Sequence, residues 1–276
     1  MAAILYPKFL FNGALTDESS PRIWPSAEEL LTADGLFETI KVVSGKPAFF
    51  ADHHARITAS ARALRMSWQV SIVNLRERCL NVIEANQVEN GSVKIVVFRE
   101  GANCGELIQV RSPAYSGEDY ARGFKLKVQR DIARATGAAH KSTRYLKNLQ
   151  AREDARSLGF DEALFVDLNG VLLEGAATNV FAVLKGELLT PPLQVGILPG
   201  VVRGLILRNW AQREAKEHSL SLETLKAANE VFVTNALLGV MPVVAIDDQA
   251  YPRSRDSITD DLMRAFRSWQ LSSLDR

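Results

Sequence analysis

The amino-acid sequence predicts a mixed α/β protein of two domains. Strand-like and helix-like runs alternate along the whole chain, and no internal repeat or low-complexity tract interrupts them. The segment 111–123 is rich in Pro, Ser, Gly and charged residues, which is typical of a connection. With 276 residues, either one large domain or two smaller ones could bury a core. We therefore predict a smaller α/β domain at 1–115, a linker at 116–123 and a larger α/β domain at 124–276.

In the first half, 37–45 and 46–50 are expected to form a hairpin that leads into a helix. Apolar residues three or four positions apart predict two helices, with Ile57, Ala61 and Leu64 in the first and Leu75, Cys79 and Val82 in the second. The β-branched run VKIVVF, 93–98, is typical of a buried strand.

The second half is predicted to be rich in antiparallel strands. Residues 124–130 alternate as a strand, and 145–158 form a helix that Gly159 ends. Residues 162–175 form two strands joined by Asn169-Gly170, a pair suited to a type I′ turn, and 179–192 continue the sheet. The remaining expected elements, in order, are a helix at 201–217, a strand–turn–strand at 230–247 and an amphipathic helix at 257–271.

Composition narrows the classes of function. Lys and Arg total 33 against 32 Asp and Glu, so the chain lacks the excess of cations with which a nucleic-acid or membrane-surface binder displaces counterions. Its two cysteines, Cys79 and Cys104, have neither the spacing of a metal site nor that of a disulfide framework. No leader pattern or membrane-spanning apolar run is recognised. We expect a cytoplasmic protein that acts on a small molecule and binds no metal, nucleic acid or membrane.

One local pattern suits an anion. The loop 197–200 contains Gly200 and runs into a helix whose first free N–H groups belong to Val201 and Val202. Local pattern alone favours a plain loop-to-helix junction over a phosphate site, and no P-loop or strand-linked G-x-G-x-x-G is present. His53 and His54 are adjacent, so they point about 100° apart on a helix and cannot chelate one ion from one face.

Four blocks, taken together, carry a family resemblance. They are DGLFETIK…ARAL (34–64), KSTRYLKN…TNVF (141–181), GELLTPP…GILPGVVR (186–203) and EVFVTNALLGVMPVVAID (230–247). In this order they resemble the class IV, fold-type IV pyridoxal 5′-phosphate (PLP) enzymes. This family comprises branched-chain and D-amino-acid aminotransferases, (R)-amine transaminases and 4-amino-4-deoxychorismate lyases. The resemblance implies a two-domain α/β fold like that of D-amino-acid aminotransferase, with PLP between the domains, and a homodimer.

The resemblance assigns two residues to the reaction itself. Lys141 would attach PLP covalently and, once free, act as the general base, for which its pKa must fall below the usual 10.4 or so. Lys147, the nearest rival, lies inside the predicted helix. Glu174, 33 positions after Lys141, would pair with the pyridine nitrogen and keep the ring able to accept electrons. Without the family blocks, the simpler interpretation would be a solvated surface amine for Lys141 and an ordinary strand-end carboxylate for Glu174.

The remaining predicted contacts hold the cofactor. Arg56 would bind the phosphate, together with the amides of Val201 and Val202 and the turn at Asn235 and Ala236. Tyr145 is a candidate contact of the cofactor's phenolic oxygen. The alternative, that Tyr145 does not contact the cofactor, is equally open. For Arg56, the alternative is a surface ion pair on a helix.

Departures from the family pattern favour one activity. Arg144 replaces the usual Asn, and Val202 stands where several transaminases have a Thr that lyases lack. The block TNALLGVMPV, 234–243, is similar to that of the aminodeoxychorismate lyases. We therefore predict a lyase that forms pyruvate and p-aminobenzoate for folate biosynthesis.

Two alternatives remain to this prediction. The first is a transaminase acting on a branched-chain or D-amino acid or an (R)-amine, which needs a carboxylate-binding Arg such as Arg144 or Arg22. The second is a non-catalytic PLP-binding or scaffold protein.

Overall fold

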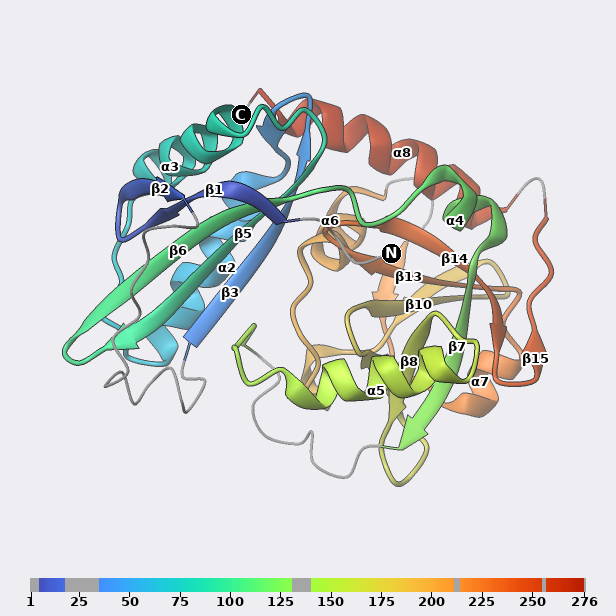
Figure 1. Ribbon diagram of the computed structural model, residues 1–276. Coiled ribbons are helices and arrows are strands. Elements are labelled where there is room, and N and C mark those ends of the chain that lie inside the picture. Colours follow the sequence, from blue (N-terminus) through green and yellow to red (C-terminus); the bar gives the residue numbers. More distant parts are fainter. Residues whose placement is uncertain (1–4, 18–34, 131–139, 211–213, 255–256, 276) are drawn as a thin grey trace. The chain divides into compact units, whose positions relative to one another are not determined.

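The computed structural model describes residues 5–17, 35–130, 140–210, 214–254 and 257–275, which form two compact units (Figure 1). Unit 1 comprises Met1–Ala114, Lys141–Arg144 and Trp269–Arg276, and unit 2 comprises Tyr115–His140 and Tyr145–Ser268. Both units combine strands and helices, which confirms the predicted mixed α/β class. No helix among the described residues is long and apolar enough to span a bilayer. Arg22, named above as a candidate for binding the substrate carboxylate, lies outside the described residues.

Unit 1 is built on one antiparallel sheet with the strand order β2-β1-β6-β5-β3-β4 in its described part. Its elements are β1 (Leu5–Phe11), β2 (Ala14–Asp17), β3 (Gly35–Val43), β4 (Lys46–Pro47), α2 (Phe50–Ala63), α3 (Ile72–Ala85), β5 (Gly91–Glu100) and β6 (Asn103–Arg111). The predicted hairpin is the β3–β4 pair, although α2 already begins at Phe50. Strand alternation sends every second side chain of β3 and β5 into one core with α2 and α3.

Two close approaches explain the local sequence of β3. The backbone of residues 141–143 pairs with the start of β3, because Phe37 N donates to Lys141 O (2.8 Å) and Thr143 N donates to Gly35 O (2.9 Å). A Cβ on Gly35 would lie 2.7 Å from Val97 O and 3.2 Å from Thr143 Oγ1. Only glycine fits between these two neighbours, so the Gly at this position is a packing requirement of unit 1.

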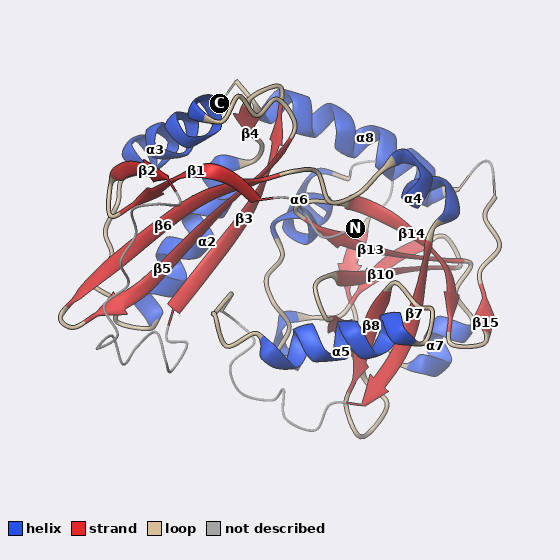
Figure 2. Cartoon of the chain, viewed as in Figure 1, coloured by secondary structure: helices blue, strands red, loops and turns tan. Residues whose placement is uncertain are grey.

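Unit 2 is built on a mixed sheet with the strand order β12-β11-β10-β13-β14-β7-β8-β9, and β15 pairs with β14. Its strands are β7 (Phe124–Arg130), β8 (Glu162–Val166), β9 (Leu172–Gly175), β10 (Asn179–Leu184), β11 (Glu187–Thr190), β12 (Ala215–Glu217), β13 (Glu230–Asn235), β14 (Gly239–Ile246) and β15 (Gln249–Ala250). Its helices are α4 (Gly117–Arg122), α5 (Leu146–Ser157), a short 3-10 helix (Leu193–Val195), α6 (Val201–Asn209), α7 (Leu222–Lys226) and most of α8 (Ile258–Ser273). Helix α5 packs against β7 and β8 (Figure 2).

The segment predicted as a linker is a helix of unit 2. Ser116 begins α4 with a capping box, in which its hydroxyl accepts from Asp119 N (3.4 Å) and Asp119 Oδ2 accepts from Ser116 N (2.8 Å). Pro, Ser and Gly therefore mark the start of a helix within this segment. Residues 141–144 group with unit 1, whereas the predicted C-terminal domain, 124–276, includes them. The assignment of 1–115 and 124–276 as folding domains stays a prediction.

Two further expectations need correction. The helix predicted at 201–217 ends at Asn209, and Ala215–Glu217 instead forms β12, parallel to β11, because pairing with a distant strand overrides local helix propensity. The turn between β8 and β9 is not type I′, since Gly170 has a positive φ (79°) and Asn169 does not. Asp167 Oδ1 instead accepts from Asn169 N (2.9 Å) and Val171 N (2.8 Å) and closes a longer loop.

Candidate active site

Glu174 lies in β9, is 6% exposed and is held by two donors in unit 2. Its Oε2 accepts from Asn179 Nδ2 and from Leu198 N, both at 3.1 Å. Asn179 begins β10, and its Nδ2 also donates to Leu198 O (3.0 Å). Because donors stabilise the charged form, this arrangement fixes a carboxylate in one orientation beside the loop before α6. The sequence did not single out Asn179, although it ends the E-G-x-x-x-N pattern around Glu174.

The start of α6 follows from the same cluster. Gly200 precedes Val201 without any side-chain cap, so the first amides of the helix have no cap from a side chain. A Cβ on Gly200 would lie 1.9 Å from Asn179 Oδ1, so only glycine fits there. Val201 and Val202 are buried, and their side chains offer no polar atom. This helix start can therefore bind an anion through backbone N–H groups alone, which is the role that the family resemblance implies.

Asn235, at the end of β13, forms an Asx-type turn. Its Oδ1 accepts from Leu237 N and Leu238 N, both at 2.9 Å, and its Nδ2 donates to Ala177 O (3.1 Å). The adjacent Thr234 pairs with Asn179 across β10 and β13. Asn235 and Ala236 therefore lie one strand away from the Glu174 cluster, and the structure brings these predicted residues together within unit 2.

Tyr145 lies immediately before α5 and reaches the same region. Its hydroxyl donates to Ala176 O, which also accepts from Asn148 Nδ2 (2.6 Å). A tyrosine hydroxyl has one proton to donate, so here the oxygen keeps only its capacity to accept. In this arrangement Tyr145 fastens the residues after Glu174, a contact that sequence reasoning did not foresee.

Lys141, in unit 1, lies over an aromatic ring. Its Nζ is 4.4 Å from the centroid of the Phe37 ring, and Lys94 Nζ is 5.0 Å from the same centroid. Burial and, to a smaller extent, the nearby charge of Arg111 lower the pKa of Lys94. Arg111 Nε is buried without a hydrogen-bond partner among the described residues. Sequence reasoning missed this group of cations, which strand alternation places on one face of the unit 1 sheet.

Arg56 forms an ion pair with a buried carboxylate, Glu38. Its Nε and Nη2 donate to the two oxygens of Glu38, each at 2.7 Å, and His53 Nδ1 lies 2.7 Å from Glu38 Oε2. Burial raises the pKa of Glu38, but the charge of Arg56 and the contact with His53 outweigh it and lower the pKa to about 2. Burial lowers the pKa of His53, which favours its neutral form. Because Phe37 and Glu38 are consecutive in β3, Lys141 and Arg56 contact opposite faces of this strand.

Replacing Glu38 by Gln is expected to lower the free energy of unfolding at pH 7 by about 3 kcal/mol, since removing one partner strands a charge. A folded-state pKa of about 2 against 4.5 contributes stability above pH 4.5 and loses it as pH falls towards 2. The deficit of the variant should therefore shrink across that window in urea unfolding curves. Glu84→Gln, on an exposed position of α3, is the matched control. A constant deficit from pH 7 to pH 2 would contradict the ion-pair account.

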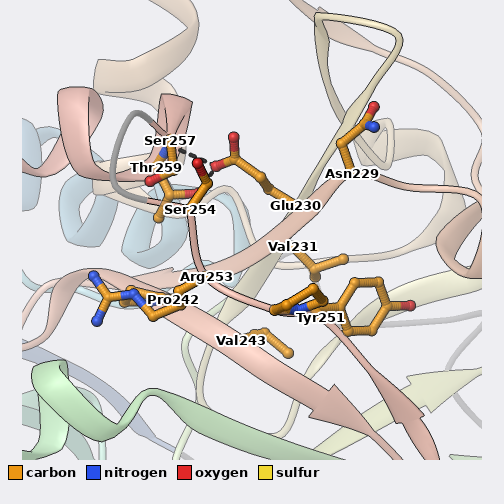
Figure 3. Close-up of a pocket in the computed structure, with 11 residues that line it drawn as sticks. Asn229, Glu230, Val231, Pro242, Val243, Tyr251, Arg253, Ser254, Ser257 and Thr259 are labelled. Atoms are coloured by element: carbon orange, nitrogen blue, oxygen red, sulfur yellow. Dashed lines mark hydrogen bonds between the residues drawn. The ribbon is translucent and has the colours of Figure 1, made fainter.

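A separate pocket in unit 2 is not this site (Figure 3). It lies beside β13 and β14, and none of the predicted site residues is among the described residues that line it. Its carboxylate, Glu230, accepts from Ile258 N (2.9 Å), Thr259 N (2.8 Å) and Thr259 Oγ1 (2.6 Å). These contacts hold the start of α8, so the Glu230 carboxylate serves the fold by binding this helix start.

Comparison with known proteins identifies the family. The model of the family "Amino-transferase class IV" matches residues 35–246, and the chain belongs to this family. A branched-chain-amino-acid aminotransferase from Escherichia coli K12 is 28% identical, covering 93% of this chain and 90% of the relative. A D-alanine aminotransferase from Staphylococcus epidermidis is 26% identical, covering 95% and 97%.

Solved structures agree with the fold. A Mycobacterium tuberculosis protein described as a hypothetical aminotransferase, in its PLP-bound form, has a TM-score of 0.87 at 20% identity and covers 98% of this chain and 100% of its own. A Legionella pneumophila protein named for 4-amino-4-deoxychorismate lyase has a TM-score of 0.84 at 24% identity, covering 91% and 97%. Both likenesses show the fold-type IV architecture, and the protein is a PLP-dependent class IV enzyme.

The residues present fit that cofactor. Gly200 makes the cradle that a Cβ would fill, α6 begins without a side-chain cap, and the buried hydroxyls of Thr178 and Thr234 have no hydrogen-bond partner among the described residues. Bound PLP supplies an electron-accepting ring and an aldehyde that reacts with amines. The Glu174 carboxylate is held in place by Asn179 and Leu198, and α6 begins without a side-chain cap on its first amides. In unit 1, the Lys141 amine lies over the Phe37 ring.

Replacing Gly200 by Ala is expected to weaken PLP binding about tenfold, which corresponds to about 1.4 kcal/mol. The new Cβ must displace Asn179 Oδ1 and so disturb both Glu174 and the start of α6. Titration of the apoprotein with PLP measures the effect. Gly204→Ala, in the same helix, is the control, because its Cβ meets only the flexible end of Arg208, at 3.0 Å. Equal PLP affinity in the two variants would contradict this account of the helix start.

Proposed function

We propose that this enzyme is a 4-amino-4-deoxychorismate lyase, which forms pyruvate and p-aminobenzoate for folate biosynthesis. The observation that carries the proposal is the Asn235 turn. The block TNALLGVMPV resembles the corresponding block of the lyases. Asn235 holds this block in place through both polar atoms of its side chain, Oδ1 and Nδ2. The apolar Val202 at the start of α6 supports the same activity, since several transaminases have Thr there.

The site residues take the following roles in this proposal. Lys141 carries the cofactor and, once released, removes the proton from the amine-bearing ring carbon of the substrate. The electron pair expels the neighbouring enolpyruvyl oxygen, the carbon–oxygen bond breaks, and the leaving enol takes up a proton to become pyruvate. Glu174 supplies the negative charge opposite the pyridine nitrogen. The ring of the substrate becomes aromatic, and no amino acceptor is consumed.

The remaining contacts bind and orient. Val201, Val202 and the turn of Asn235 and Ala236 bind the phosphate in the proposal, with Arg56 as a further cation and Tyr145 beside the phenolic oxygen. Lys94 and Arg111 support an anionic substrate, because two neighbouring cations on one sheet face favour a carboxylate-bearing ligand. A substrate with carboxylates suits the lyase and amino-acid transaminases alike.

The second candidate is an aminotransferase, and the names of the two sequence relatives favour it. It would use Lys141 and Glu174 in the same roles, but the proton would return to the cofactor and the amino group would pass to a keto acid. The two activities therefore differ in the fate of one electron pair. Arg144, a candidate for binding the substrate carboxylate, is exposed in unit 1.

One experiment separates the two candidates. The PLP-loaded enzyme is incubated with aminodeoxychorismate and no keto acid, and pyruvate is followed through lactate dehydrogenase while p-aminobenzoate is followed by its fluorescence. We expect equal amounts of both products. If neither forms, and amino-group transfer begins once a keto acid is added with a branched-chain or D-amino acid, the aminotransferase is the correct assignment.

We also propose a homodimer that works in the cytoplasm. Family resemblance supports the dimer, and the nearly balanced charge of +1 suits a small-molecule enzyme. Light scattering should give twice the chain mass of 30.5 kDa. A mass of one chain would contradict the dimer.

A further inference from the structure

The turn that follows Glu174, residues 175–178, is fastened on several sides within unit 2. Ala176 O accepts from Tyr145 OH, and Ala176 N donates to Ala163 O (3.0 Å). Ala177 O accepts from Asn235 Nδ2 (3.1 Å). The turn therefore links three of the predicted cofactor contacts, and a shift of its backbone would move them together.

A buried carboxylate lies directly against this turn. Glu162, the first residue of β8, is 0% exposed, and a Cβ on Gly175 would be 3.3 Å from its Cγ. Its Oε1 accepts from Ala163 N (3.1 Å), and the N–H of Ala177 also interacts with the carboxylate and favours its charged form. Glu162 thus packs against Gly175 at the start of the turn, and its charge interacts with the Ala177 N–H.

The charge that faces Glu162 comes from α5. Arg152 Nε is 3.8 Å from Glu162 Oε2, too far for a hydrogen bond, and neither atom has a hydrogen-bond partner among the described residues. Arg152 Nη2 donates instead to Tyr115 OH (3.2 Å), and Arg156 adds a weaker charge from the same helix. The carboxylate is therefore buried beside a cation that makes no hydrogen bond to it, and this arrangement stabilises its negative charge only in part.

We propose that Glu162 is a positioning residue of the active site, whose ionised carboxylate holds the 175–178 turn and, through it, Tyr145, Glu174 and Asn235. The inference rests on the proposed function only in taking these three residues as cofactor contacts. It does not depend on whether the enzyme is a lyase or an aminotransferase.

The environment of Glu162 makes this role depend on pH. Burial raises its pKa to about 7, and Arg152, the Ala163 and Ala177 amides and Arg156 offset only part of that effect. Protonation near neutral pH removes the negative charge that interacts with the Ala177 N–H. Activity should therefore fall as pH drops through about 7, without any change in the residues that touch the cofactor.

The apoprotein tests the titration without the cofactor. Between pH 4.5 and 7, the unfolded chain ionises Glu162 while the folded chain keeps the proton, so the wild type loses stability as pH rises. Its unfolding equilibrium constant, relative to that of Glu162→Gln, should rise by up to roughly two orders of magnitude from pH 4.5 to pH 8. Parallel stability curves for the two proteins would overturn the proposal.

The holoenzyme tests the positioning. Glu162→Gln should keep its PLP absorption but show a kcat about tenfold below wild type at pH 8 and flat from pH 6 to pH 8, because a misplaced site loses rate steeply. Glu153→Gln, exposed on α5, should retain the wild-type profile. Arg152→Gln provides a second test should the first variant not fold. Loss of the opposing positive charge should move the fall in activity to higher pH. If kcat still falls near pH 7 in these variants as it does in the wild type, the role of Glu162 is refuted, whichever substrate is turned over.

Discussion

Replacing Lys141 by Ala is expected to abolish turnover and to remove the visible absorption band of the lysine-bound cofactor. One amine serves both as the covalent attachment and as the base in our proposal, so no other group can replace it. Loss of a placed base alone typically costs about 10²–10⁴-fold in rate, and loss of the attachment adds to this. Steady-state assays and absorption spectra of the purified variant measure the two effects separately.

The control for this prediction is Lys147→Ala. Lys147 is exposed on α5, six positions after Lys141, and should keep both the band and the activity. A fully active Lys141→Ala protein would refute every catalytic assignment made for this chain. Loss of both band and activity in the Lys147 variant, with Lys141→Ala unaffected, would transfer the role to the rival lysine.

Replacing Glu174 by Gln is expected to lower kcat by about 10²–10³-fold, as removal of one preorganised electrostatic contact typically does. Glutamine is nearly isosteric and can still accept from Leu198 N, so the loop before α6 should stay in place. What is lost is the negative charge that, in our proposal, pairs with the pyridine nitrogen and keeps the ring in its electron-accepting form. The absorption band should persist, because Lys141 is unchanged.

Glu187→Gln serves as its matched control, since that carboxylate lies on β11 with its side chain 59% exposed. It should retain wild-type kcat. A Glu174→Gln enzyme with a kcat close to that of the wild type would contradict the pairing of Glu174 with the cofactor ring. Loss of the band as well would show instead that the substitution disrupts the fold around Asn179.

Local sequence patterns predicted most elements well, and the two failures below have different causes. The spacing of Leu75, Cys79 and Val82 predicted α3 correctly, and all three side chains are buried in the core of unit 1. The pattern failed at β12, where 215–217 pairs with β11, because a distant strand decides the conformation there. At 116–123 composition did not reveal α4, which begins at the Ser116–Asp119 capping box, and the linker proposed there stays a prediction.

The sequence alone determined most strands and helices, the family, the cofactor and the residue types available for binding it, since these depend on local periodicity and on motifs of fixed spacing. Tertiary structure decided which polar groups pair with one another in hydrogen bonds and ion pairs. Arg56 is bonded to Glu38, 18 positions away, and Tyr145 gives its proton to Ala176, 31 positions away. Glu162 is buried with an incomplete partner on α5. Burial and hydrogen-bond pairing depend on contacts between segments far apart in the chain, so no local pattern can reveal them.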